Sequence, residues 1–439
     1  MNALDGAYWL VAALTAPVWS RQARGDWRGR FGHAAALPPP TRARILLHAV
    51  SVGEVNALRG LVPMLIDGGA EVVVSVGTDT GIARARDLFE RGAGAGAGAG
   101  VVGVVGGVGG VGGVVRYPLD FSKSVRRFLD AVKPTAVGLV ELELWPNFIR
   151  ECGRRSIPVA VINGRLSARS FKGYRRVRGL LARTFGSLRT AAVQDEVYAE
   201  RFVALGVSRE RCVVTGSMKW DSARVEDEVA GAEALGAALG IDRARPLVVA
   251  GSTGPGEEGM LHEACLKAGR GVQLMCAPRK PERFEEAAAA LPGCVRRSQR
   301  LGGAGGAGGG TARDGGTPGG GRFLLDTIGE LRAAYSLADV VVVGRSFGRL
   351  YGSDPIEPIA LGKATVIGPR YGDFETIVEA LGRAGGIRKA ASAESLAADL
   401  GQLLGDPEGR RELARRGREC IAANQGATRR HAELLLKLA

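Results

Sequence analysis

The sequence predicts an α/β protein built from two doubly wound domains. Short apolar runs that are typical of buried parallel strands alternate with helical stretches rich in Arg, Ala and Leu. The alternation pauses at a polar stretch near Asp221–Asp227 and then restarts, which indicates two βα series with a cleft between them. A chain of 439 residues is long enough for two domains with substantial cores.

The expected strands follow from these apolar runs and the Gly, Pro, Asn and Ser residues that bound them. In the first series they are Ile45–Val50, Glu71–Val76, Ala136–Val140, Val159–Ile162, Thr190–Val193 and Val213–Thr215. In the second series they are Leu247–Ala250, Val272–Cys276, Val340–Val343 and Ala364–Ile367. We therefore place one domain at 33–225 and the other at 226–439, with a helical tail from about Asp406 that can pack back across the cleft.

Two Gly-rich segments interrupt the series, at 92–113 and 301–321. Because Gly loses much entropy on ordering, we interpret both as flexible insertions. Neither contains the Gly-x-x-x-x-Gly-Lys-Ser/Thr pattern of a phosphate loop. We assign them no chemistry.

The charge of the chain favours an anionic partner. The formal net charge is +14, and between Arg150 and Arg189 eleven Lys or Arg residues stand against one acid, Glu151. Such one-sided charge suits a phosphate-bearing or membrane-embedded substrate. An aromatic content of only 5% and the lack of a known nucleic-acid-binding motif argue against nucleic acid.

Metal chemistry has no support in the sequence. The six cysteines include no Cys-x-x-Cys pair, and the four histidines show no His-Glu-x-x-His spacing. We therefore expect no zinc site, and we expect reduced cysteines in a cytoplasmic environment.

The N-terminus, residues 1–32, has the pattern of an interfacial membrane anchor. The apolar run Ala7–Trp19 is too short for a clear spanning helix, and its positive charge follows the run, unlike that of a secretory signal. Arg21, Arg24, Arg28 and Arg30 supply that charge. Aromatic and basic residues together favour attachment to an anionic membrane. A surface helix docked on the core of the protein fits the same pattern.

Glu54 is the first candidate catalytic residue. It follows the strand Ile45–Val50 through Ser51-Val52-Gly53, and open α/β sheets bind ligands at the carboxyl ends of their strands. A carboxylate there is well placed for general-base work. The same spacing also fits a capping box, with Ser51 as the helix N-cap and Glu54 at the third helical position.

Further acidic and basic side chains extend this candidate site. Glu141 ends another strand at the same sheet edge, and two neighbouring acids can divide acid and base roles. Glu143 fits better as a residue that orients loops through hydrogen bonds. Lys219 could stabilise developing negative charge, although taken alone it is better explained by a surface ion pair. Arg165 or Arg169 could hold a phosphate.

The second half carries several weak signals that together describe a nucleotide-sugar pocket. Ala250–Glu258 combines a strand, a Gly-rich turn and a helix, which offers backbone N–H groups to an anion. The other segments are Ala277–Phe284, Asp326–Leu331 and Gly352–Pro358. In the last of these, Glu357 beside Gly and Pro could bind ribose hydroxyls.

Taken in order, these motifs resemble the 3-deoxy-D-manno-octulosonic acid (Kdo) transferases of Gram-negative bacteria. The resemblance runs from Tyr8 to the C-terminal helix and breaks mainly at the Gly-rich segments. It is carried by SVGE, ELWPN, NGRLSARS, GSMKWD, AGST, PRKPERF, DTIGEL and PIEP.

The resemblance implies a GT-B glycosyltransferase, with two Rossmann-like domains that face a cleft. The donor would be CMP-Kdo and the acceptor a phosphorylated tetraacyl lipid A precursor (lipid IVA), at the cytoplasmic face of the inner membrane, in lipopolysaccharide biosynthesis. The transfer would invert the anomeric centre without a metal or other cofactor. Glu54 falls on the general base of the family, and Glu141 and Lys219 fall on residues assigned to transition-state stabilisation. The implied CMP contacts are Pro278, Arg279, Ile328, Gly329, Glu330, Asp354, Pro355, Ile356 and Glu357.

Three residues depart from the family pattern. Lys280 and Gly254 each stand where the family usually has His, and Asp354 stands where it usually has Asn. Lys280 keeps a cation, whereas Gly254 loses a side chain, and Asp354 would repel a phosphate unless it is protonated or binds hydroxyls. Two alternatives therefore stay open: a GT-B enzyme for another nucleotide sugar, and a catalytically weakened relative that binds lipid or nucleotide.

Overall fold

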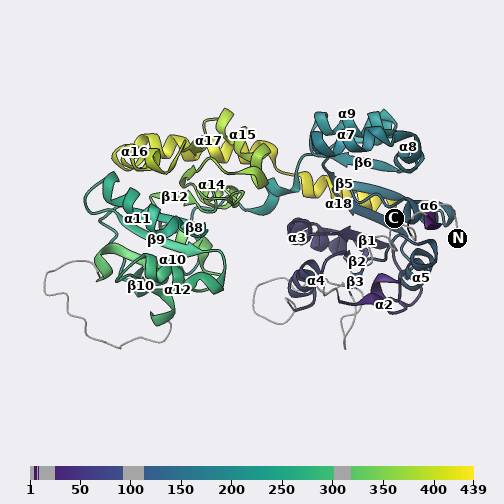
Figure 1. Ribbon diagram of the computed structural model, residues 1–439, viewed down its shortest axis with the longest axis horizontal. Coiled ribbons are helices and arrows are strands. Elements are labelled where there is room, and N and C mark those ends of the chain that lie inside the picture. Colours follow the sequence, from purple (N-terminus) through teal and green to yellow (C-terminus); the bar gives the residue numbers. More distant parts are fainter. Residues whose placement is uncertain (1–3, 7, 9–24, 92–112, 301–317) are drawn as a thin grey trace. The chain divides into compact units, whose positions relative to one another are not determined.

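The computed structural model describes residues 4–6, 8, 25–91, 113–300 and 318–439. The chain forms two compact units. Unit 1 comprises Met1–Asp221 together with Gln425–Ala439, and unit 2 comprises Ser222–Asn424. Each unit is an α/β layer structure around one parallel sheet (Figure 1).

The sheet of unit 1 has seven parallel strands in the order β3-β2-β1-β4-β5-β6-β7. The order reverses between β1 and β4, which is the topological switch point where open α/β sheets bind ligands. The strands are β1 (Arg44–Ala49), β2 (Glu71–Val76), β3 (Val114–Arg116), β4 (Ala136–Val140), β5 (Val159–Gly164), β6 (Thr190–Val193) and β7 (Cys212–Val214).

Helices cover both faces of this sheet, because alternate residues of each strand point to opposite faces. Ile45 and Leu47 of β1 pack with the first group of helices, whereas Leu46 packs with the second group. The first group is α3 (Val52–Asp67), α4 (Asp79–Arg86) and α18 (Ala427–Leu438). The second group is α5 (Ser122–Val132), α6 (Pro146–Arg154), α8 (Arg178–Gly186) and α9 (Glu196–Leu205). Two further helices, α2 (Trp27–Arg30) and α7 (Ala168–Arg176), complete the set named in unit 1.

Unit 2 repeats the doubly wound plan with the order β10-β11-β9-β8-β12-β13-β14, again all parallel. Its switch point lies between β8 and β12. The strands are β8 (Leu247–Thr253), β9 (Gln273–Pro278), β10 (Val295–Arg296), β11 (Arg322–Leu324), β12 (Val340–Val343), β13 (Ala364–Ile367) and β14 (Arg388–Lys389). The helices are α10 (Ala232–Leu239), α11 (Glu257–Ala268), α12 (Phe284–Ala290), α13 (Leu331–Leu337), α14 (Ile356–Ala360), α15 (Glu375–Arg383), α16 (Ala393–Gly405) and α17 (Pro407–Asn424).

Every strand expected from the sequence is present, with ends that differ by at most a few residues. The sequence patterns missed β3, β10, β11 and β14, which are short strands of two or three residues near the sheet edges. Short edge strands carry too few residues for a hydrophobic period to stand out. β3 and β11 also come directly after the two Gly-rich segments, and most of each segment lies outside the described residues.

The division of the chain differs from the expected 33–225 and 226–439 at its C-terminal end. Helix α17 belongs to unit 2, whereas α18 belongs to unit 1. Asp221 explains the placement of α18, since its carboxylate accepts hydrogen bonds from the Gly426 and Thr428 backbone N–H groups at 2.7 Å and from Thr428 Oγ1 at 2.7 Å. The start of the last helix is thereby tied to the last residue of the first segment.

The expected anchor lies mostly outside the described residues. Of the run Ala7–Trp19, only Tyr8 is described. A search of the described ranges found no helix long and apolar enough to cross a bilayer.

Candidate functional site in unit 1 and nucleotide-pocket residues in unit 2

Glu54 forms the capping box that begins α3. Its backbone N–H donates to Ser51 Oγ at 3.3 Å, and its carboxylate accepts from the backbone N–H groups of Val50 (2.8 Å) and Ser51 (3.2 Å). Ser51 Oγ also donates to Glu54 Oε1 at 2.8 Å. The two interpretations of this motif therefore do not exclude each other, because the capping contacts fix the carboxylate at the switch point.

The capping contacts leave Glu54 with spare accepting capacity. An ionised carboxylate has about four lone-pair sites, and the contacts above occupy two on Oε1 and one on Oε2. Glu54 is also only partly buried.

Glu141 lies on the other side of the switch point, directly after β4. Its φ of 60° is in the left-handed region, which is uncommon for a residue with a side chain and concentrates at functional sites. Burial and the charge of Glu54 raise the pKa of Glu141, while Arg165 and Lys219 oppose that shift. The structure thus brings the predicted residues Glu54, Glu141 and Lys219 into one electrostatic cluster, with Arg165 as a fourth member.

Glu143 is a member of the same cluster. Burial, together with the charges of Glu54 and Glu141, raises the pKa of its carboxyl from 4.5 to about 7, against the effect of a hydrogen bond from Trp145. Trp145 Nε1 donates to Glu143 Oε2 at 3.0 Å, and the indole is 40% exposed. Glu143 therefore orients the loop, as expected, and it also adds a group that titrates near neutral pH, which the sequence pattern did not indicate.

Asn163 positions the segment that carries Lys219. Its backbone has a φ of 51°, and its Oδ1 accepts from the Met218 N–H at 3.0 Å. That bond holds the 3₁₀ turn Met218–Ser222, where Lys219 lies. The backbone N–H of Asn163 donates to Nε2 of the buried His431 in α18 at 3.2 Å. Asn163 is a positioning residue that the sequence reasoning missed, and the only signal for it was Asn-Gly at a strand end.

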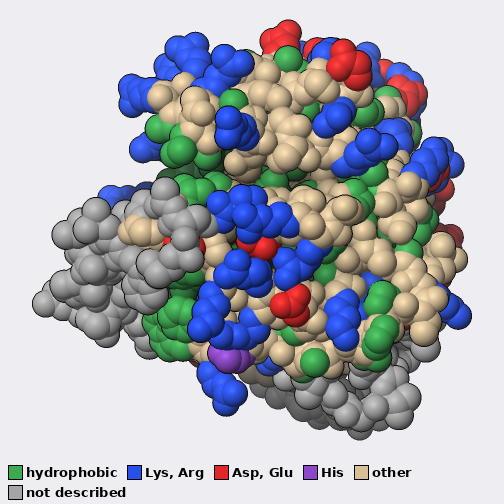
Figure 2. Space-filling view, turned by 90° about the vertical axis from the view of Figure 1, so that its right-hand side faces the viewer, with side chains coloured by type: hydrophobic (Ala, Val, Ile, Leu, Met, Phe, Trp, Pro, Cys, Tyr) green, Lys and Arg blue, Asp and Glu red, His purple; other side chains and the backbone are tan. Residues whose placement is uncertain are grey.

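Unit 1 also exposes a basic surface on the expected Arg150–Arg189 region. Helix α7 buries none of its residues. Its basic residues form no ion pair within the described part of the chain. The exposed apolar side chains of Val177 and Leu180 follow directly after it. Lys and Arg outnumber Asp and Glu on the face that Figure 2 shows.

In unit 2, two buried acids build the loops at the switch point. Glu257 accepts backbone N–H bonds from Gly254 (2.7 Å), Arg345 (2.6 Å) and Phe347 (3.0 Å), and so joins the loops after β8 and β12. Glu258, which is 1% exposed, forms a two-pronged ion pair with Arg283 at 3.0 and 2.9 Å. The side chains of Glu257 and Glu258 are therefore engaged in holding these loops in place.

Three of the predicted CMP contacts act electrostatically on one buried phenol, Tyr335. Burial, then the charges of Glu357 and Asp354, raises the pKa of Tyr335, and Arg279 opposes that shift. Arg279, at the end of β9, is exposed. Asp354 Oδ1 accepts from the Ile356 N–H at 2.8 Å, which fixes the turn through Pro355 into α14. The charges of Arg279, Asp354 and Glu357 therefore all act on Tyr335.

The remaining predicted contacts, Pro278 and Ile328–Glu330, lie at the ends of β9 and β11. Ile328 is 72% exposed, and Gly329 has a φ of 97°, which favours glycine. Glu330 accepts from Arg297 at 2.9–3.1 Å and from Thr327 Oγ1. Burial alone would raise the pKa of Glu330, but these hydrogen bonds outweigh it and lower the pKa. Its side chain is thus engaged by Arg297.

The departures from the family pattern have local consequences. A Cβ at Gly254 would lie 3.1 Å from Leu350 Cδ1 and 3.4 Å from Arg345 Cγ, so these side chains flank the space that a larger residue would enter. Lys280 is exposed. Asp354 serves the turn described above, which Asn could serve equally.

Within the described ranges, no group of three or more His, Cys, Asp or Glu side chains has the arrangement of a metal site. Independence of a metal stays a prediction.

Comparison with known proteins adds a family to this geometry. The family model described as 3-deoxy-D-manno-octulosonic-acid transferase (kdotransferase) matches residues 25–222. A 3-deoxy-D-manno-octulosonic acid transferase of Bordetella pertussis is 32% identical, with 98% of each chain covered. One from Haemophilus influenzae is 29% identical over 94% of this chain and 91% of its own. Among solved structures, Anabaena HepE in complex with UDP has a TM-score of 0.55 at 12% identity and covers 90% of this chain and 100% of its own, which indicates a shared fold.

Proposed function

Because the chain belongs to the family of 3-deoxy-D-manno-octulosonic acid transferases, we propose that it transfers Kdo from CMP-Kdo to a phosphorylated tetraacyl lipid A precursor, lipid IVA. The observation that carries this proposal is the cluster at the switch point of unit 1. There a fixed, partly exposed carboxylate, Glu54, stands beside Glu141 and Lys219.

Glu54 is the general base in this proposal. An acceptor hydroxyl gives its proton to Glu54 as its oxygen bonds to the anomeric carbon of Kdo. The bond from that carbon to the phosphate oxygen breaks at the same time, and CMP leaves with the electron pair. One displacement inverts the anomeric centre and needs a single base, in contrast to a double displacement through a covalent intermediate.

Lys219 and Arg165 supply positive charge next to Glu141. Their part is to offset the negative charge that gathers as the base, the acceptor and the leaving phosphate approach one another. Glu141 keeps the two cations oriented.

The residues of unit 2 are assigned to the nucleotide. Arg279 receives the charge of the CMP phosphate, and Asp354 and Glu357 bind hydroxyl groups, which suits carboxylates that would repel a phosphate. Six further residues surround the nucleotide in this proposal: Pro278, Ile328, Gly329, Glu330, Pro355 and Ile356. No metal or other cofactor takes part.

The acceptor and the membrane are assigned to unit 1. Exposed basic residues on α7, with Val177 and Leu180 beside them, suit the phosphates of a lipid and an anionic bilayer surface. We place the enzyme at the cytoplasmic face of the inner membrane, held there by the N-terminal segment.

The test is transfer by the purified full-length protein, given CMP-Kdo and the tetraacyl lipid A precursor in detergent with EDTA present. Mass spectrometry of the lipid should show added Kdo. No product while CMP still binds would overturn the assignment of substrates. A product from another nucleotide sugar, but not from CMP-Kdo, would favour the alternative enzyme that the departures at Gly254 and Asp354 suggest.

A further inference from the structure

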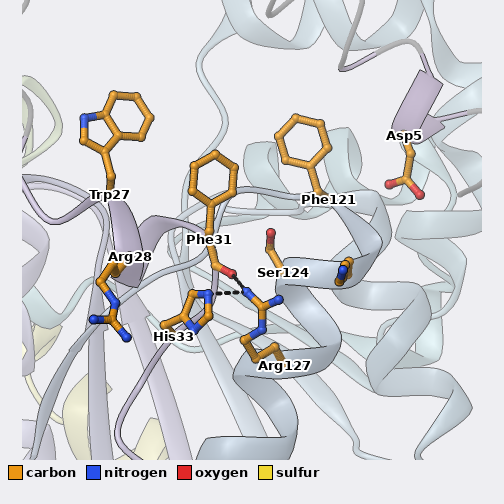
Figure 3. Close-up of a pocket in the computed structure, with 9 residues that line it drawn as sticks. Asp5, Trp27, Arg28, Phe31, His33, Phe121, Ser124 and Arg127 are labelled. Carbon is orange, nitrogen blue, oxygen red and sulfur yellow. Dashed lines mark hydrogen bonds between the residues drawn. The ribbon is translucent and has the colours of Figure 1, made fainter.

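A cavity of about 490 Å³ lies between α2 and α5 in unit 1. The residues assigned to transfer do not line it. Figure 3 shows that the side chains around it separate by chemistry, with the rings of Trp27, Phe31 and Phe121 on one side and Arg28 and Arg127 on the other. We call it the α2–α5 cavity.

The aromatic side is partly open to solvent. Trp27 and Phe31 stack with their ring centroids 6.2 Å apart, and they are 39% and 37% exposed. Adjacent exposed rings are unusual on a soluble surface, and they are typical of residues that meet the membrane interface or a ligand. Phe121, which precedes α5, adds a third ring to the same side.

The opposite side is cationic. Arg28 and Arg127 lie on it, and Lys123 also lines the cavity. None of the three forms an ion pair in the described part of the chain. Arg127 Nη1 also lies 2.6 Å from His33 Nε2, and the pKa of His33 is lowered by desolvation and then by the charges of Arg127 and Arg28. Asp5, the acid that lines the cavity, directs its Oδ1 to the Ser122 N–H at 2.9 Å and to Asn147 Nδ2 at 3.2 Å.

The cavity is preformed. Arg127 Nη1 donates to the Phe31 carbonyl at 2.8 Å, and Leu119 N–H donates to the Arg30 carbonyl at 2.7 Å. The turn after α2 also meets α5 so closely that a Cβ on Gly32 would lie 2.0 Å from the Ser124 carbonyl oxygen. A ligand would therefore lose little free energy to ordering of the walls.

We propose that the α2–α5 cavity binds the phosphate headgroup of an anionic membrane glycerolipid. The phosphate lies against Arg28, Lys123 and Arg127, and the glycerol and the start of the acyl chains lie against Trp27 and Phe31. A cavity of this volume suits one headgroup. The aromatic wall distinguishes a lipid from free phosphate, which would gain nothing from the rings. The site is separate from the Glu54 cluster and does not depend on which sugar is transferred.

The experiment uses a short-chain phosphatidylglycerol below its critical micelle concentration, so that no bilayer is present, and follows its binding to the full-length protein by calorimetry. The test variant is R28Q/K123Q. The matched control is K267Q/R270Q, which removes the same charge from an exposed surface of unit 2. Short-chain phosphatidylcholine and inorganic phosphate are the comparison ligands, and thermal unfolding checks that both variants fold.

Phosphatidylglycerol should bind, and R28Q/K123Q should weaken it on the order of thirtyfold, since each basic residue near an anionic lipid contributes about fivefold. The control pair should leave it unchanged. W27A should also weaken binding without any loss of charge. Equal losses in the two double variants would overturn the proposal in favour of general surface charge. Equal affinity for inorganic phosphate, or equal affinity for phosphatidylcholine, would overturn it as well.

Discussion

The capping box at α3 allows the chemical role of Glu54 to be separated from its structural role. In E54Q the carbonyl oxygen of Gln can take the place of Oε1 and keep the bonds from Ser51, while the amide nitrogen cannot accept from the Val50 N–H, now at 2.8 Å from Oε2. One lost hydrogen bond costs about 1 kcal/mol. S51A removes the N-cap hydroxyl, which also costs about 1 kcal/mol. The two variants should therefore lower the free energy of unfolding by similar amounts.

Their effects on transfer should differ widely. Loss of a general base lowers the rate by about 10²–10⁴-fold, equivalent to roughly 3–5 kcal/mol in the barrier. S51A keeps the carboxylate of Glu54, and its transfer rate should fall by less than about tenfold, which corresponds to less than about 1.4 kcal/mol in the barrier. Urea unfolding, single-turnover transfer from CMP-Kdo and CMP binding would be measured on both. If S51A lost as much transfer as E54Q, or if E54Q kept more than a tenth of the wild-type rate, Glu54 would be a cap and nothing more.

Substitutions at three further positions, Glu143, Asp221 and Arg283, test other parts of the structure. Because the pKa of Glu143 is raised from 4.5 to about 7 on folding, the folded protein binds more protons than the unfolded chain in that range, and its stability falls as the pH rises through it. E143Q should remove this pH-dependent loss of stability and therefore raise Tm more at pH 8 than at pH 5. An equal rise in Tm at the two pH values would contradict this account of Glu143. D221A removes three hydrogen bonds from the start of α18, which should lower the free energy of unfolding by about 2 kcal/mol and speed proteolysis near the C-terminus. Unchanged proteolysis would contradict the role of Asp221 in holding α18. R283M leaves the buried Glu258 without its ion-pair partner and should lower the free energy of unfolding by about 3–5 kcal/mol, whereas R283M/E258L should recover most of that loss in urea unfolding. A double variant no more stable than R283M would refute this account.

The sequence allowed most strands and the acidic pair to be predicted because both depend on local pattern. A buried run of apolar residues gives β1 and β4, and the parallel topology then brings Glu54 and Glu141 to one edge. The short strand β3 carries no such run of its own. It forms because its residues complete the ladder beside β2, which is a tertiary effect that overrides weak local preference.

The placement of α18 could not be read from local pattern either. It depends on bonds between Asp221 and residues more than 200 positions away in the chain, and on the contact of Asn163 with His431. Nothing in the helical pattern of the tail distinguishes α17 from α18 with respect to the unit that each joins. The left-handed backbone of Glu141 and the raised pKa of Glu143 are equally products of the assembled site.

The two units use one local motif for different ends. In each, the first strand of the sheet leads through a Gly-containing turn to a Glu that accepts backbone N–H bonds: Ser51-Val52-Gly53-Glu54 after β1, and Gly254-Pro255-Gly256-Glu257 after β8. The difference comes from the strand across the switch point.

In unit 2 the loop after β12 directs the N–H groups of Arg345 and Phe347 at Glu257, which is 3% exposed. In unit 1 the loop after β4 instead brings a second carboxylate, Glu141, toward Glu54. Each of the two carboxylates accepts three hydrogen bonds, so the difference lies in access: Glu257 is buried beneath the neighbouring loop, whereas Glu54 is partly exposed. The loop across the switch point therefore makes Glu257 a brace in unit 2 and leaves Glu54 accessible for the role of base that we propose for it in unit 1.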